Sequence, residues 1–273
     1  MLQKTPRQKE NSMNYLPISA IILRHLWLIR NYMNRLLFVF YWPTLDILMW
    51  GFVGKYMQTI QGTDNIQIIF LLSILLWSAF ARIGMEVFQA LLEELWSNNI
   101  VNIFASPIKL SEWIVGVILF VILMFIVLMS FLILLIGLFY DISIISLFKN
   151  FIIFAPSLLL AAISIGFLAL SIIIYSGIRF AEIAYVIMWT FMPFSGVFYP
   201  IETLPMWAQK ISYCLPMTYT FTGMRAYVQN QIDPTPYLIK SIILSLIYGA
   251  AFLGLFFYMF NKSKDKGLSR LTD

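Results

Sequence analysis

The sequence predicts an all-α membrane protein with six transmembrane helices, and three observations support this prediction. The chain of 273 residues is 61% hydrophobic and only 11% charged, whereas soluble domains are about half apolar and about a quarter charged. It contains several apolar stretches of the length, roughly 20 residues, that crosses about 30 Å of hydrocarbon. These stretches lack the alternation of polar and apolar side chains that is typical of barrel strands.

Six stretches meet the length requirement, one of them with qualifications. They cover residues 36–58, 66–88, 113–139, 150–175, 182–199 and 237–260. Because they occupy more than half of the chain, no room remains for a soluble catalytic domain. We therefore expect a tail with an interfacial helix (1–35), a six-helix transmembrane domain (36–260) and a basic tail (261–273).

The rarity of cysteine and histidine excludes several kinds of site. Cys214 is the single cysteine, so neither an internal disulfide nor a cysteine-cluster metal site is possible. His25 is the single histidine, and we expect it to be solvated or interfacial rather than a ligand. No residue is predicted to be catalytic or to bind a metal. The first ~35 residues lack the short apolar core and cleavage site of a secretory signal.

Basic residues predict the orientation. Some precede the first predicted span in the sequence, namely Lys4, Arg7, Lys9, Arg24, Arg30 and Arg35. Others follow the last predicted span, namely Lys262, Lys264, Lys266 and Arg270. An even number of spans places both tails on one side, and the positive-inside rule makes that side the cytoplasm. The net charge of +5 is thus an orientation signal, and its division between two short tails argues against nucleic-acid binding.

The N-terminal part of the chain carries an amphipathic segment and an unusual first span. Residues 15–33 mix aliphatic residues, arginines and a tryptophan, which predicts an interfacial helix; the alternative is an extension of the first span. In that span, Asp46 costs about 2.5–3.5 kcal/mol at a helix centre, so it should face protein or water. Pro43, Asp46 and Trp50 are therefore candidate pathway residues, although Asp46 could equally bond a neighbouring helix.

The loop after the second span, residues 89–113, is the most polar internal one. Glu93 and Glu94 lead into a short amphipathic pattern, which Pro107 ends. The pattern predicts a short helix parallel to the membrane and exposed to the cytoplasm, where it would form a docking surface for a soluble partner. Alternatively, it is a packed interfacial elbow.

The stretch "FYPIETLPMWAQKISYCLP", residues 198–216, is too short to span a membrane and too apolar for an ordinary loop. Pro200, Pro205 and Pro216 bound segments of four and ten residues, and ten helical residues rise only ~15 Å. Non-helical backbone at membrane depth is tolerated only where protein or a watery cavity covers it. We therefore expect a hairpin that enters the membrane partway from the outside.

Two stretches resemble permease subunits of the ABC type-2 export family. One follows the family's signature of small residue, glycine, two Leu-Pro pairs, Thr-Tyr and arginine, here at Ser195, Gly196, Pro200, Leu204, Pro205, Leu215, Pro216, Thr218, Tyr219 and Arg225. The other is similar to the family's cytoplasmic loop, here at Ile103, Phe104, Ala105, Ser106, Pro107 and Gly116. Many members carry Gly-Thr-Leu-Glu where this chain has Asn98, Asn99, Ile100 and Val101, so the detailed partner contacts do not carry over.

The resemblance implies a specific assembly. Such permeases have an N-terminal interfacial helix, six spans, a cytoplasmic coupling helix and external re-entrant helices, and they work as dimers in the plasma membrane, here a bacterial inner membrane, with one ATPase beneath each half. "GFVGKY" at 51–56 lacks the spacing of a phosphate-binding loop. The resemblance therefore assigns ATP and magnesium to two copies of a partner ATPase, and no cofactor to this chain.

The same resemblance assigns two groups of site residues. Contact with the ATPase is assigned to Glu93, Glu94, Trp96, Asn98, Asn99, Phe104, Ser106 and Pro107. The external gate is assigned to Pro200, Leu204, Pro205, Trp207, Pro216, Tyr219 and Arg225. Aromatic residues of the spans could line a substrate route or merely pack, namely Phe40, Tyr41, Trp42, Trp50, Trp77 and Trp189.

The sequence thus favours the membrane subunit of an ATP-driven exporter for an amphipathic or lipid-linked substrate. A proton-driven secondary transporter that uses Asp46 is the alternative, although no convincing internal repeat supports it. An enzyme acting on lipid would need clustered acids, histidines or a nucleophile with its base, and these are too sparse here. The sequence does not identify the cargo.

Overall fold

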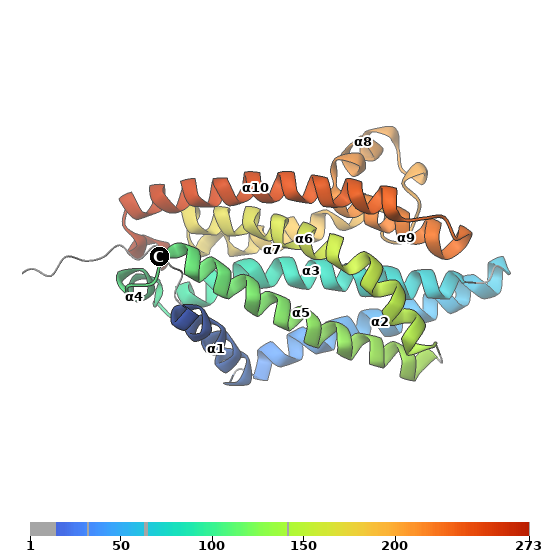
Figure 1. Cartoon of the computed structure of the whole chain (residues 1–273), viewed down its shortest axis with the longest axis horizontal. Helices are drawn as coiled ribbons and strands as arrows, with labels where there is room; N and C mark the ends of the chain where they lie inside the picture. Colours follow the sequence, from blue (N-terminus) through green and yellow to red (C-terminus); the bar gives the residue numbers. More distant parts are fainter. Residues whose placement is uncertain (1–14, 32, 63–64, 141, 273) are drawn as a thin grey trace, which may run out of the picture.

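The computed structural model describes residues 15–31, 33–62, 65–140 and 142–272, which are almost entirely helical (Figure 1). Five helices are long: α2 (Met33–Gln61), α3 (Ile66–Trp96), α5 (Leu110–Tyr140), α6 (Ile144–Ser176) and α10 (Thr235–Asp265). Five are shorter: α1 (Tyr15–Asn31), α4 (Ile100–Ala105), α7 (Ala181–Thr190), α8 (Met206–Cys214) and α9 (Pro216–Asn230). Four short 3₁₀ segments complete the described part: η1 (Ile178–Phe180), η2 (Met192–Phe194), η3 (Ile201–Thr203) and η4 (Leu268–Thr272).

Within the described part of the chain, four helices are long and apolar enough to cross a membrane: α3, α5, α6 and α10. This finding confirms the prediction of an all-α membrane protein. With 29 residues, α2 has a comparable length of roughly 43 Å. The count of six spans stays a prediction, as do the proposed domain divisions, and the tail 1–14 lies outside the described residues.

The fifth predicted span differs from the structure. A continuous helix over 182–199 is wrong, because α7 ends at Thr190 after 10 residues and is followed by the single turn η2. Pro193 in that turn lacks an N–H and disfavours further helix. Gly196 then has a φ of 62°, in the left-handed region that a helix does not use. The helical part of α7 rises only ~15 Å.

The core lies between α3 and α6, which pack against each other in the centre of the bundle. In α3, 83% of the most apolar window is buried, compared with 11% in α10. Small residues allow the two central helices to approach closely, since a Cβ on Gly166 would lie 2.9 Å from the carbonyl oxygen of Gly84. The outer helices α2 and α5 pack on α3, and α10 packs on α6.

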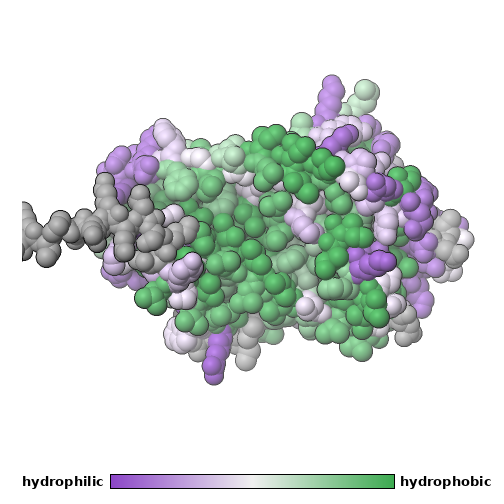
Figure 2. All heavy atoms as spheres, viewed as in Figure 1, coloured by the Kyte–Doolittle hydropathy of each residue, from purple (hydrophilic) through white to green (hydrophobic). Residues whose placement is uncertain are grey.

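Large apolar side chains remain exposed on the outer helices. On α10 these are Ile239, Ile243, Leu246, Ile247, Phe257 and Tyr258, and α5 exposes a similar row. Figure 2 shows that, on the face in view, apolar residues occupy mainly the middle of the molecule and polar residues gather toward both ends of the long axis. This distribution is that of a protein whose middle part contacts hydrocarbon.

Two ends of the bundle can be distinguished along this axis (Figure 1). At one end, α1, α4 and η4 gather, and we call it the α4 end. Helices α8 and α9 lie toward the other end, together with the connections after α2 and α9, and we call it the hairpin end. Continuous helices, above all α3, run from one end to the other.

Candidate functional site

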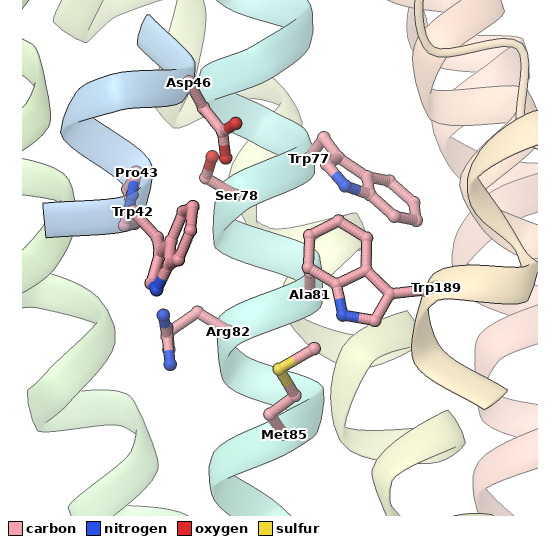
Figure 3. A pocket seen from close by; sticks show the side chains of 9 residues that line it. All are labelled: Trp42, Pro43, Asp46, Trp77, Ser78, Ala81, Arg82, Met85 and Trp189. Carbon is pink, nitrogen blue, oxygen red and sulfur yellow. The ribbon is translucent and has the colours of Figure 1, made fainter. Parts of the chain in front are cut away.

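A pocket lies between α2, α3 and α7 (Figure 3). It is a small, partly open pocket with a cavity volume of about 40 Å³, and it is lined by Trp42, Pro43, Asp46, Trp77, Ser78, Ala81, Arg82, Met85 and Trp189. Three tryptophan rings make the walls largely apolar. The remaining groups bring one carboxylate, one guanidinium and one hydroxyl into an otherwise apolar site.

The charged groups of the pocket come from neighbouring helices. Asp46 on α2 and Ser78 on α3 point toward each other, and the guanidinium of Arg82 lies beside the ring of Trp42 (Figure 3). The charge of Arg82 acts on Asp46, which offsets part of the cost of holding a carboxylate within the membrane. Among the described atoms, neither the Ser78 hydroxyl nor the Trp77 indole N–H has a hydrogen-bond partner. The pocket therefore offers two donors as well as two charges.

Only two of the three candidate pathway residues line the pocket. Pro43 and Asp46 line it, whereas Trp50 does not. The Trp50 ring instead stacks on Phe198, with 3.7 Å between ring centroids and 13° between the planes. Trp50 thus connects α2, one turn beyond Asp46, to the segment that enters the hairpin.

The aromatic residues of the predicted spans form two groups, those that line the pocket and those that pack elsewhere. Trp42, Trp77 and Trp189 line it, but Phe40 packs edge-on against Phe131. Tyr41 is exposed and packs edge-on against Trp42. Only some of the aromatic rings in the spans therefore contribute to the pocket walls.

At the α4 end, the acids expected in an exposed loop belong to the last turns of α3. The Nε and Nη2 atoms of Arg24 donate to the two carboxylate oxygens of Glu94, each at 2.6 Å. The Asn99 amide donates to the same carboxylate at 3.0 Å. Because Glu94 is only 1% exposed, it is satisfied inside the protein and joins α3 to α1, and its carboxylate is not accessible to a docking partner.

A second contact between α1 and α3 lies beside the first. The Nδ1 atom of His25 lies 3.1 Å from a carboxylate oxygen of Glu93, and the imidazole stacks on Phe120 of α5 with centroids 4.9 Å apart. His25 is completely buried, so the expectation of a solvated histidine is wrong, and its position at the membrane interface stays a prediction. The reason is tertiary: α1 packs against α5 and covers the ring.

The remaining candidate contact residues surround α4. Trp96, Asn98 and Pro107 are exposed, and Asn99 and Ser106 are partly exposed; the side chain of Phe104 lies outside the described part. Asn98 has a φ of 53°, which asparagine tolerates better than most residues and which turns the chain from α3 into α4. The result is a short surface helix that directly follows the rigid α3.

At the hairpin end, each of the three prolines stands at the start of a helical element. Pro200 precedes η3, Pro205 precedes α8, and Pro216 is the first residue of α9. Proline fits such positions because its fixed φ suits the first turn and its missing N–H has no partner there. On α8, Trp207 is exposed and packs edge-on against Phe194. Leu204 is partly exposed beside it.

Arg225 binds the turn that leads into the hairpin. Its Nη1 atom donates to the carbonyl oxygens of Gly196 and Val197, and the residue is only 8% exposed. Burial lowers the pKa of Arg225 to about 10, so the guanidinium stays charged at neutral pH. Arg225 is therefore a structural clamp on the turn 195–200 and does not line the pocket.

Neutral hydrogen bonds attach the hairpin to the bundle. The Thr220 hydroxyl lies 2.9 Å from Ser157 of α6 and 2.9 Å from Ser241 of α10. Tyr219 donates to the carbonyl oxygen of Tyr213 at 2.9 Å, which closes α8 onto α9. The hairpin is thus fixed to both α6 and α10.

Several of these residues were not predicted as site residues. Arg24 and His25 belong to a segment that the sequence predicts to be an amphipathic helix, and a histidine next to an arginine is the only local signal there. Arg82 of the pocket is a charge within a predicted span, four residues before Glu86, whereas Thr220 of the hairpin gives no distinct signal. Each acts through a residue far away in the chain, which periodicity does not reveal.

Comparison with protein families provides one match. The family model described as "ABC-2 family transporter protein" matches residues 46–258, which is more than three quarters of the chain and includes most of the pocket, α4 and the hairpin. A comparison with curated proteins found no match.

Proposed function

The chain belongs to the ABC-2 family of transporter proteins, and from this premise we propose that it is the permease subunit of an ATP-driven exporter. Membership implies association with an ABC ATPase. In this proposal the ATPase is a separate chain, present in two copies, that carries ATP and magnesium. The permease itself forms a homodimer in the plasma membrane, with both termini in the cytoplasm, and performs no bond chemistry.

The observation that carries the proposal is the continuity of α3 between the pocket and the α4 end. Arg82 lines the pocket and Glu94 binds Arg24 on the same unbroken helix, about 18 Å apart at 1.5 Å per residue. A displacement of α4 by the ATPase is passed to α3 through the short connection at 97–99. Because α3 is rigid and buried, the movement reaches the pocket wall with α1 carried along.

The hairpin end supplies the gate in this mechanism. Trp50, one turn from Asp46, stacks on Phe198, so a shift of α2 relative to α3 acts on the segment that enters the hairpin. The exposed apolar side chains of α8, including Trp207, then offer a surface over which an amphipathic substrate leaves. We therefore assign α8 and the turn before it to the exit.

The pocket chemistry suggests the substrate class. Tryptophan walls suit an apolar or planar moiety, and the pair of Asp46 and Arg82 suits a polar or zwitterionic head. With a cavity volume of about 40 Å³, the pocket receives only a small group of a substrate in this conformation, not a whole lipid-linked molecule. We infer that the substrate is amphipathic or lipid-linked and that the pocket receives one part of it.

The first test is purification of the tagged chain in mild detergent, with identification of the proteins that accompany it. We expect a stoichiometric ATPase. Replacing exposed residues at the α4 end, Trp96→Ala with Val101→Asp, should lower its retention at least tenfold. The matched control is Trp207→Ala, since Trp207 is as exposed as Trp96 but lies at the hairpin end. Equal loss in both variants, or a chain that always purifies alone, would contradict the proposal.

A proton-driven transporter is the second candidate, favoured by the position of Asp46 in the pocket. In that case Asp46→Asn abolishes transport driven by a pH gradient in vesicles that contain only this chain. An exporter driven by ATP instead shows no transport in such vesicles until an ATPase and ATP are supplied.

A further inference from the structure

Cationic side chains gather around one tyrosine at the α4 end. The Nζ atoms of Lys266 and Lys262 lie 4.7 and 5.3 Å from the ring centroid of Tyr175, and the guanidinium of Arg270 lies 5.9 Å from it. The Lys266 amine also donates to the Tyr175 hydroxyl at 3.2 Å. Three positive charges thus surround a single aromatic ring at the end of α6.

No carboxylate balances these charges in the described part of the chain. The ion pairs there involve Glu93 and Glu94, and neither Asp265 nor Glu182 pairs with a member of the cluster. The π face of one ring attracts each cation only weakly when the site is exposed, while the three cations repel one another. The cluster therefore has an excess of positive charge that an anion would neutralise.

The fold positions this cluster, so it is more than a run of charge in a loose tail. The Nη2 atom of Arg270 donates to the carbonyl oxygen of Tyr175 and to the Ser263 hydroxyl, each at 3.0 Å. Leu271 is completely buried, and its carbonyl lies 3.0 Å from where a Cβ on Gly177 would stand. The expected basic tail 261–273 is thus folded back: α10 continues to Asp265, and η4 packs against the end of α6.

The exposed apolar face of α10 leads directly to the cluster. Tyr258 and Ile247 on this face are 59% and 57% exposed, and Lys262 also lies over the Tyr258 ring, 5.8 Å from its centroid. We propose that Tyr175, Lys262, Lys266 and Arg270 bind the phosphate of an anionic phospholipid whose acyl chains lie along α10. Positive charge at the boundary and apolar surface beside it match the two halves of such a lipid.

The test uses the full chain, purified and delipidated in mild detergent, with bound lipid counted by native mass spectrometry. Phosphatidylglycerol and phosphatidylcholine are added separately at equal concentrations. We expect the wild-type chain to retain phosphatidylglycerol preferentially, and Lys262→Gln with Lys266→Gln to weaken its binding about thirtyfold. The matched control, Lys55→Gln with Lys149→Gln, removes the same charge at exposed positions of the opposite end and should change binding less than about twofold.

Other outcomes would overturn the proposal. Equal retention of the two lipids would mean that the cluster does not select an anionic headgroup. Equal weakening in the two double variants would mean that the lysines act only through the general charge of the protein. Displacement of phosphatidylglycerol by inorganic phosphate at equal concentration would identify a site for a free anion. Loss of a bound ATPase in the Lys262/Lys266 variant, with lipid retention unchanged, would identify a protein contact instead.

Discussion

At the α4 end, α1 is attached to α3 by charged side chains. At the hairpin end, α8 and α9 are instead attached to the bundle by neutral hydrogen bonds and by one buried arginine that binds backbone carbonyl oxygens. The bidentate pair of Arg24 and Glu94 is a discrete contact between segments 70 residues apart. The contacts of Thr220 and Arg225 instead involve hydroxyls and carbonyl oxygens of several elements.

The difference indicates that α1 and α3 move together as a unit, whereas the hairpin stays attached to α6 and α10. A bidentate ion pair keeps two helices in register, so α1 follows α3 when α3 moves. Several weak neutral bonds hold the hairpin against both α6 and α10, and losing one of them leaves the others in place. We therefore expect single substitutions to be more harmful at the α4 end.

The largest effect is expected from replacing one partner of the Arg24–Glu94 ion pair, and its size should depend on which partner is replaced. The Glu94 side chain is 2% exposed and that of Arg24 is 39% exposed, so Arg24→Met leaves a buried, unpaired carboxylate. It should lower the free energy of unfolding by roughly 3–5 kcal/mol, compared with roughly 1–3 kcal/mol for Glu94→Gln. Unfolding in mixed micelles by titration with SDS measures both. The control is Arg30→Met, on the exposed face of α1; an equal effect there would remove the basis of the comparison.

The second-largest effect is expected at the hairpin end, from the replacement of Arg225. Arg225→Met leaves the carbonyl oxygens of Gly196 and Val197 without their donor in a buried site. We expect a loss of roughly 2–4 kcal/mol in the free energy of unfolding. Lys210→Met, an exposed cation on α8, should cost less than about 0.5 kcal/mol. If the two variants unfold alike, Arg225 does not clamp the turn.

The third effect concerns the turn that Arg225 holds. Gly196→Ala places a Cβ at a φ of 62° and 3.2 Å from the Arg225 guanidinium, so it should destabilise the protein by about 1–2 kcal/mol. Gly254 on α10 has open space around it, and Gly254→Ala should stabilise by roughly 0.5–1 kcal/mol. Thermal unfolding in detergent gives both shifts, and effects of the same sign would contradict the assignment.

The smallest effect is expected on α9, where the hydrogen bonds of Thr220 can be compared with the unbonded hydroxyl of Thr222 among the described atoms. Thr220→Val removes bonds to Ser157 and Ser241, at a cost of about 0.6–1.7 kcal/mol, typical of hydrogen bonds between helices in membranes. The Thr222 hydroxyl is buried with no hydrogen-bond partner among the described atoms, so Thr222→Val should be neutral or stabilising. A larger loss at Thr222, measured by the same SDS titration, would show that the hydrogen-bond network is not what attaches the hairpin.

The sequence predicted those elements whose signals are local. The apolar run 113–139 became α5, which extends it by a few residues at the start, and the prolines at 205 and 216 bound α8 as expected. Proline and hydrophobic length act within one segment, so a single sequence suffices to read them. Residues 66–88 already show how this fails at a boundary, because α3 continues to Trp96 through polar residues that another helix satisfies.

Residue roles that depend on partners far away in the chain were less predictable. Trp50 was expected in the pathway but stacks on Phe198, about 150 residues away in the chain. Pro43 and Asp46 do line the pocket, yet its other walls come from α3 and α7. Arg225 matched the family signature as a gate residue, and only its position beneath Gly196 shows what it holds.

By itself, the sequence determined that the protein is helical and resides in a membrane, and that prolines bound α8, because apolar length and proline geometry are properties of consecutive residues. The tertiary structure alone decided that Glu94 binds Arg24 instead of facing a partner, that His25 is buried, and that the C-terminal cations surround Tyr175. The physical reason is that helical periodicity specifies neighbours three and four residues apart. Contacts between helices depend instead on how the helices pack.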